Sequence, residues 1–123
     1  MSKKLFWINR GRSFVYAFRG VSYALKTQRN LWIQLSFLLL AVILGWVFDI
    51  EHLEWLTIIG VSGLVLALEI LNTAVETFLD THYPEKDPKI GLVKDIAAGA
   101  VLVAAIAALI VGLVIFIPKL LAL

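Results

Sequence analysis

The chain has 123 residues, 61% of them hydrophobic, and a formal net charge of +2. Its mean hydropathy is +0.92, and because soluble domains carry roughly 45 to 50% apolar residues, this composition indicates a membrane protein. A chain this short excludes a separate soluble catalytic domain, so we expect residues 1–123 to form one integral membrane domain. The absence of cysteine excludes disulfides, thiolate metal sites and a cysteine nucleophile.

The N-terminal segment is basic and amphipathic: residues 1–30 hold seven Lys or Arg and no acid. Apolar side chains recur there every three or four residues, and basic side chains recur every seven residues on another face. The apolar set is Phe14, Phe18, Val21 and Leu25, and the basic set is Arg12, Arg19 and Lys26. This pattern predicts a surface helix over about residues 13–28, with Ser13 as its N-cap, although a frayed tail would look similar over the first dozen residues.

Three apolar runs predict membrane-spanning helices at residues 31–48, 55–79 and 96–117. A cleaved signal peptide is the alternative for the first run, but residues 47–51 offer no small-residue cleavage site. Asp95 is placed to cap the third helix, and Pro118 with Lys119 predicts its end. The expected fold is therefore an all-α membrane protein with one amphipathic surface helix and three spans.

The loop charges predict the orientation of the spans. Residues 49–54 contain three acids and no Lys or Arg, whereas residues 80–95 contain Lys86, Lys89 and Lys94. Because basic residues favour the cytoplasmic side, we expect the N-terminus and the second loop inside the cell and the C-terminus outside.

Small residues recur along two of the spans and predict close helix packing. They are Ala100, Ala104, Ala108 and Gly112 in the third span, and Gly60, Gly63 and Ala67 in the second.

Four polar residues interrupt the second span: Glu69, Asn72, Glu76 and Asp80. Their spacing of three, four and four residues places them on one face of a helix. A carboxylate at mid-bilayer costs about 2.5 to 3.5 kcal/mol on insertion scales, so such residues usually face protein or a water-filled cleft. Ion pairing that only holds helices together is the structural alternative.

Depth along the helix separates the polar residues. With the second span running toward the cytoplasm, Glu69 lies about 16 Å deeper than Asp80. A charged nucleotide would meet Asp80 and Glu76 first, and a lipid headgroup would meet Glu69. Lys94, next to Asp95, adds a positive charge beside the expected N-terminus of the third helix, which is a favourable place for phosphate. Carboxylates, a lysine and a deep acid are groups that phosphoryl transfer uses, but a proton or cation pathway would use similar groups.

The segments 69–76, Asp80 and 94–100 resemble the prokaryotic diacylglycerol kinase and undecaprenol kinase family. The resemblance runs from about Phe14 to the end of the third span. It implies transfer of the γ-phosphoryl group of ATP to a membrane lipid alcohol, with Mg²⁺, in a homotrimer of the bacterial cytoplasmic membrane. The expected partners are ATP and the lipid, with no nucleic acid, and the lipid is either undecaprenol or diacylglycerol.

The resemblance also implies a role for each polar residue. It makes Glu69 the general base toward the lipid hydroxyl and Glu76 a magnesium ligand that also faces the nucleotide. The remaining implied roles are nucleotide contacts for Lys94, Asp95 and Asp80, and organisation of the site by Asn72, Arg29 and Asn30. Gln28 stands where the family commonly has a metal-binding Glu, so an amide replaces a charged ligand there.

Two functions from other classes remain as alternatives. An oligomeric ion or proton conductor would line a pore with the same acids and would not need Lys94 or Asp95. A structural protein would tolerate Glu69→Gln. Soluble-enzyme classes are disfavoured, because the chain has no Gly-rich phosphate loop, and neither His52 nor His82 has a partner His at metal-ligand spacing.

Overall fold

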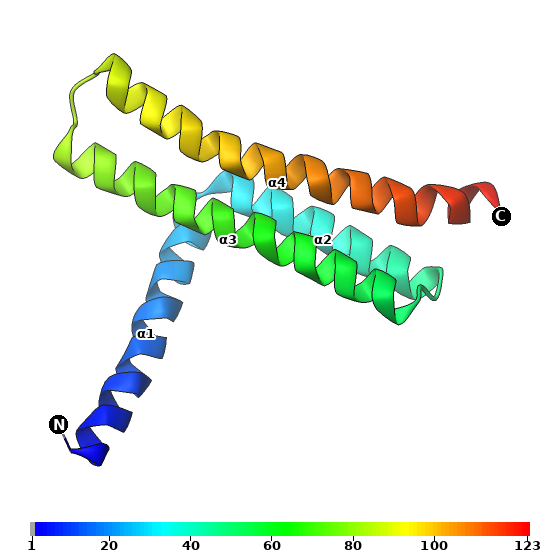
Figure 1. The fold of residues 1–123 in the computed structure, drawn as a ribbon, viewed down its shortest axis with the longest axis horizontal. Coiled ribbons are helices and arrows are strands. Elements are labelled where there is room, and N and C mark those ends of the chain that lie inside the picture. The colour runs from blue at the N-terminus through cyan, green and yellow to red at the C-terminus, as the bar shows by residue number, and fades with distance from the viewer. Residues whose placement is uncertain (1) are drawn as a thin grey trace.

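The computed structural model describes residues 2–123, which form four helices and no strand. The helices are α1 (Lys3–Thr27), α2 (Arg29–Val47), α3 (His52–His82) and α4 (Pro88–Leu121). Helices α2, α3 and α4 lie side by side, and all three are long and apolar enough to cross a membrane (Figure 1). The prediction of an all-α protein with a surface helix and three spans is confirmed.

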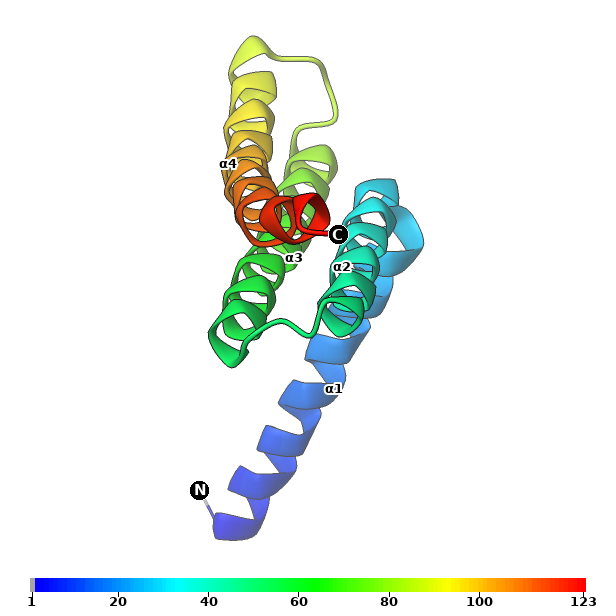
Figure 2. The same ribbon diagram turned by 90° about the vertical axis from the view of Figure 1, so that its right-hand side faces the viewer.

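Helix α1 projects away from the other three helices and joins them only near its C-terminal end (Figure 2). It starts at Lys3, where the Ser2 hydroxyl accepts a hydrogen bond from the Leu5 amide. The predicted cap at Ser13 is therefore wrong: Ser13 lies inside the helix and donates to the Asn9 carbonyl at 3.1 Å. The extended backbone of Gln28 separates α1 from α2.

The turn between α2 and α3 is tightly packed. Asp49 adopts a left-handed backbone with φ of 49°, and Ile50 behind it is buried. A Cβ atom on Gly45 would lie 2.5 Å from the Trp55 ring, so only glycine allows that ring to lie against α2. Glu51 and Glu54 form a capping box that starts α3.

Helices α3 and α4 are antiparallel neighbours joined by residues 83–87. Helix α4 begins eight residues before the expected start of the third span, since Asp87 caps it and Pro88 occupies its first turn. The predicted cap at Asp95 is therefore wrong, because Asp95 lies inside α4. The predicted stop at Pro118 is also wrong, because α4 continues to Leu121 and the Lys119 ammonium donates to the Ile115 carbonyl.

The core is small, as expected for a chain that exposes apolar side chains to lipid. A cluster near the α2–α3 turn joins three helices and is centred on Ile50, Ile58, Ile115 and Phe116. Ala104 is buried as predicted, and Ala108 and Gly112 are half-buried. Four small residues face outward in this chain, so for them close packing stays a prediction: Gly60, Gly63, Ala67 and Ala100.

Candidate active site

The polar stripe of α3 continues the helix face that packs into the core. Toward the α2–α3 turn that face buries Ile58 and Val65, and toward the α3–α4 loop it buries Glu69 and Asn72. Exposure falls stepwise along the stripe: Asp80 is exposed, Glu76 is half-buried, Asn72 is 8% exposed and Glu69 is 3% exposed. The stripe therefore leads from the aqueous end of α3 to a buried carboxylate.

Within the stripe, Asn72 is oriented by Glu76. The Asn72 amide nitrogen donates to a Glu76 carboxylate oxygen at 3.3 Å. This bond fixes the amide so that its carbonyl oxygen is free to accept, and within residues 2–123 that buried oxygen has no hydrogen-bond partner. A buried unsatisfied oxygen beside a carboxylate indicates a ligand that supplies positive charge or a donor.

Lys94 and Asp80 form an ion pair that joins α4 to α3 at the loop end. Their side chains are 36% and 64% exposed, so water and solutes reach both groups. Asp95 is the next residue along α4 and is exposed. The structure therefore brings Lys94 to the exposed end of the polar stripe. The expected position of Lys94 beside a helix N-terminus is wrong, because α4 begins at Pro88 and Lys94 lies inside it.

The three residues from the α1–α2 junction do not make the predicted site contacts. Gln28 is half-buried, while Arg29 and Asn30 are exposed at the first turn of α2. In the part of the chain that the structure describes, none of these three side chains makes a hydrogen bond or ion pair with the stripe. Their assignment to the site stays a prediction.

Two clefts flank the stripe at this end of the molecule. One, of about 410 Å³, lies between α1 and α3 and is mostly apolar, with walls that include Ala24, Ile70 and Phe78. Tyr23 and His82 add polar groups to its lining. The other, of about 510 Å³, follows the α3–α4 loop, and its lining residues are Asp80, Tyr83, Pro84, Glu85, Lys86, Asp87, Pro88, Ile90, Gly91 and Lys94. The charged cleft thus includes Asp80 of the stripe, and the apolar cleft lies beside the stripe on α3, with Thr73 and Thr77 in its lining.

The oxygen groups of the stripe fit a magnesium ion in part. No group of three or more His, Cys, Asp or Glu within residues 2–123 is placed to hold a metal. Magnesium, however, is commonly held by one or two carboxylates together with substrate phosphates and water. The Glu76 carboxylate and the unpartnered Asn72 carbonyl oxygen supply hard oxygen ligands of that kind.

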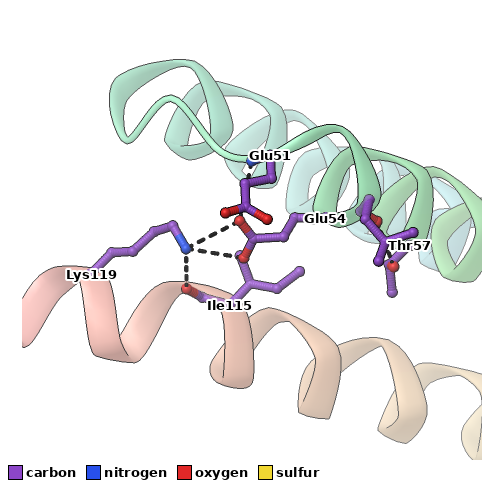
Figure 3. A network of polar contacts seen from close by, with 6 residues as sticks. Glu51, Glu54, Thr57, Ile115 and Lys119 are labelled. Carbon is purple, nitrogen blue, oxygen red and sulfur yellow. Dashed lines mark hydrogen bonds and ion pairs between the residues drawn. The ribbon is translucent and has the colours of Figure 1, made fainter.

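Two features of the structure were missed by sequence reasoning. Thr73 is 3% exposed on the buried face, and its hydroxyl donates to the Glu69 carbonyl at 2.9 Å. Its position four residues after Glu69 was the available signal. At the opposite end of the bundle, Lys119 on α4 forms an ion pair with Glu54 on α3 (Figure 3). No sequence signal links these two residues, which are 65 positions apart.

These observations define a class: a small multi-pass membrane protein that carries acidic side chains on the buried face of one helix. The model of one protein family, prokaryotic diacylglycerol kinase, matches residues 15–116. The chain belongs to that family. It is thereby a phosphotransferase of the lipid kinase type with an alcohol acceptor, and neither the structure nor the comparisons support an ion conductor.

Curated relatives cover most of the chain. An undecaprenol kinase of Bacillus subtilis is 38% identical over 109 residues, which is 89% of each chain. A diacylglycerol kinase of Synechocystis sp. is 45% identical over 115 residues, 90% of this chain and 64% of that protein. A diacylglycerol kinase of Escherichia coli is 31% identical over 109 residues, 83% of this chain and 89% of that protein. The family match at residues 15–116 therefore covers the C-terminal half of α1, all of α2 and α3, and most of α4.

Proposed function

We propose that this protein transfers the γ-phosphoryl group of ATP to the hydroxyl of a membrane lipid alcohol, undecaprenol or diacylglycerol, at the cytoplasmic face of the bacterial inner membrane. The observation that carries this proposal is the graded stripe on α3, which runs from exposed Asp80 to Glu69 at 3% exposure. A water-soluble nucleotide and a lipid hydroxyl approach such a stripe from opposite ends.

Glu69 is the proposed general base. It is the most deeply buried acid of the stripe, and a carboxylate at membrane depth is retained where it meets a reacting group, since stability is served better by apolar packing. The apolar cleft between α1 and α3 is the proposed path for the lipid, because it includes Thr73, whose hydroxyl bonds to the Glu69 backbone. Glu69 would accept the proton of the lipid hydroxyl as that oxygen attacks the γ-phosphorus of ATP and the bond to the departing ADP breaks.

Lys94 is the proposed phosphate-binding residue. Its ammonium group lies at the wet end of the stripe, in the charged cleft beside the α3–α4 loop. A positive charge there neutralises negative charge on the transferring phosphoryl group, which is the main task of a protein in this chemistry. Asp80 holds Lys94 toward α3, and Asp95 would contact the nucleotide from the next position of α4.

Magnesium is the proposed metal, and when bound it would neutralise charge on the nucleotide phosphates. Glu76 and Asn72 would hold it, since a carboxylate and an unpartnered amide oxygen adjoin each other there. Gln28 would add an uncharged oxygen, with Arg29 and Asn30 organising the same edge of the site.

The orientation and the assembly are proposals as well. Basic residues favour the cytoplasmic side of a membrane, and the region of the α3–α4 loop contains Lys86, Lys89 and Lys94. The proposed orientation therefore has this loop in the cytoplasm and the C-terminus outside the cell. A homotrimer, implied by the family resemblance, would cover the outward-facing small residues, of which Gly60 and Gly63 have open space around the Cβ position. Within residues 2–123 no three His, Asp or Glu side chains gather to hold a metal, and a site shared between copies would supply further ligands.

A lipid panel tests the reaction. Protein reconstituted in vesicles is given Mg²⁺, ATP labelled at the γ-phosphate, and either undecaprenol, diacylglycerol or a control lipid without a free hydroxyl. We expect label in the organic extract with at least one alcohol and none with the control lipid. Absence of labelled lipid with every alcohol, in protein that still binds ATP, would refute the proposal.

A further inference from the structure

Two ion pairs join α3 to α4, one at each end of the bundle. Near the α3–α4 loop, Lys94 pairs with Asp80, and at the far end Lys119 pairs with Glu54 (Figure 3). In both pairs α4 provides the lysine and α3 provides the acid. The proposed function uses only the first pair, and Lys119 lies beyond residues 15–116, which match the family.

The Glu54–Lys119 pair also makes hydrogen bonds to backbone groups at the start of α3 and near the end of α4. The Lys119 nitrogen lies 3.0 and 3.3 Å from the two Glu54 carboxylate oxygens, and it also donates to the Ile115 carbonyl at 3.3 Å. The Glu54 carboxylate accepts from the Glu51 amide at 3.1 Å as part of the cap of α3. The two side chains are 28% and 23% exposed, so they are screened less than a pair on an open surface.

The two pairs have matching spacings on the two helices. Glu54 and Asp80 are 26 residues apart on α3, and Lys94 and Lys119 are 25 residues apart on α4, so at 1.5 Å per residue the separations are about 39 and 38 Å. Both exceed the roughly 30 Å of a bilayer's hydrocarbon core, which places the pairs near the two interfaces, where charged groups are tolerated. A slide of α4 by one turn would break both pairs.

Between the two pairs, the buried side of α4 includes a run of small residues. Ala104, Ala108 and Gly112 recur every fourth residue on the buried side of α4. A slide of α4 by about one turn would therefore replace one small side chain with another at the same place. Large side chains, which resist such a slide, form the cluster of Ile58, Ile115 and Phe116 near the α2–α3 turn. Toward the α3–α4 loop, the larger buried apolar side chains of these two helices are Val65 and Leu79 on α3 and Val101 on α4.

We propose that the Glu54–Lys119 pair is a register lock, which holds α4 at the axial position at which Lys94 meets Asp80. Glu54 and Lys119 are thus positioning residues that act on the site from the opposite side of the membrane. The lock itself is independent of the reaction, and only its effect on the kinetics rests on the proposed function. Its chemistry is an interhelical carboxylate–ammonium pair, with no ligand required.

A distance measurement between α3 and α4 tests the lock without any need for activity. Because the chain has no cysteine, spin labels can be placed at Thr81→Cys and Leu92→Cys, two exposed positions at the loop end. In Lys119→Met we expect the label–label distance distribution to shift or broaden by several ångströms, up to about one helical turn of 5.4 Å. Glu54→Gln should give a smaller change, and Lys119→Arg should restore the wild-type distribution. His52→Gln, an exposed change at the same end, is the matched control.

Kinetics test the consequence for the site. We expect Lys119→Met to raise KM for ATP on the order of threefold and to leave kcat nearly unchanged, with Lys119→Arg close to wild type. Wild-type label distances in both Lys119→Met and Glu54→Gln would overturn the lock, whatever the activity. Shifted distances in Lys119→Met, together with a wild-type protein that phosphorylates no lipid, would support the lock and would refute the proposed function instead.

Discussion

The two halves of α3 bury different chemistry although they belong to one continuous helix. The half near the α2–α3 turn buries Ile58 and Val65 and is joined to α2 by the Trp55 ring on Gly45. The half near the α3–α4 loop buries Glu69, Asn72 and Thr73. Since a buried carboxylate is less favourable for stability than an apolar side chain, the comparison indicates that one half holds the fold together, while the other half is the one that the proposed function uses. Substitutions in the apolar half should therefore lower the stability of the protein, and substitutions in the polar half should lower its activity.

The largest effect is expected from Glu69→Gln, in the polar half. A neutral amide does not accept the hydroxyl proton, so the rate of lipid phosphorylation should fall by about 10²- to 10⁴-fold. Initial rates with labelled ATP measure this, and calorimetric ATP binding to the same variant should remain close to wild type. The melting temperature should be unchanged or higher. Equal loss of ATP binding and of turnover would contradict the role of Glu69 as a base.

Gly45→Ala, in the apolar half, should produce the opposite outcome. The new Cβ would lie 2.5 Å from the rigid Trp55 ring, and such overpacking typically destabilises by about 1–3 kcal/mol. Thermal unfolding in detergent micelles should show a lower melting temperature, with near-normal activity per folded molecule at low temperature. Gly11→Ala is the matched control, because nothing lies within 4 Å of its Cβ position. An equally large loss of stability in Gly11→Ala would show that contact with the Trp55 ring does not explain the effect of Gly45→Ala.

Gln28→Glu would add a charged oxygen ligand from the α1–α2 junction to the proposed metal site. We expect the Mg²⁺ concentration that gives half-maximal activity to fall several-fold, because a carboxylate binds this ion more tightly than an amide does. Titration of activity with Mg²⁺ at saturating ATP provides the measurement. Gln34→Glu, on the following helix, is the control for added charge, and an unchanged Mg²⁺ requirement in Gln28→Glu would place Gln28 outside the metal shell.

The smallest effect is expected from Asp80→Asn. The Lys94–Asp80 pair is well exposed, and exposed pairs contribute about 0 to 1 kcal/mol. KM for ATP should change by less than about fivefold in either direction, and the change should shrink at high salt. A loss of turnover comparable to that of Glu69→Gln would show that Asp80 acts directly on the substrates.

The sequence predicted the helices and the polar stripe because both depend on local patterns. Apolar run length indicated the three spans, and the spacing of Glu69, Asn72 and Glu76 placed them on one face. The helix ends were predicted less well, because hydropathy marks where a chain meets lipid, whereas caps decide where a helix begins. Asp87 with Pro88 starts α4 well before its apolar run.

Contacts between helices were beyond what the sequence could predict. Glu54 and Lys119 pair only because α3 and α4 are antiparallel and in one particular register. The outward direction of Gly60 and Gly63 likewise depends on which face of α3 the other helices cover. Such facts follow from packing over long sequence separations, which local periodicity does not encode.

Binding of Mn²⁺ in place of Mg²⁺ tests the central claim, that the stripe on α3 is where metal and nucleotide meet. Electron paramagnetic resonance would count bound Mn²⁺ in the presence of a non-hydrolysable ATP analogue, for the wild-type protein and for Glu76→Gln. The account predicts a nucleotide-dependent site in the wild type whose affinity falls by roughly tenfold or more when the carboxylate is removed. The same affinity in both proteins would contradict it.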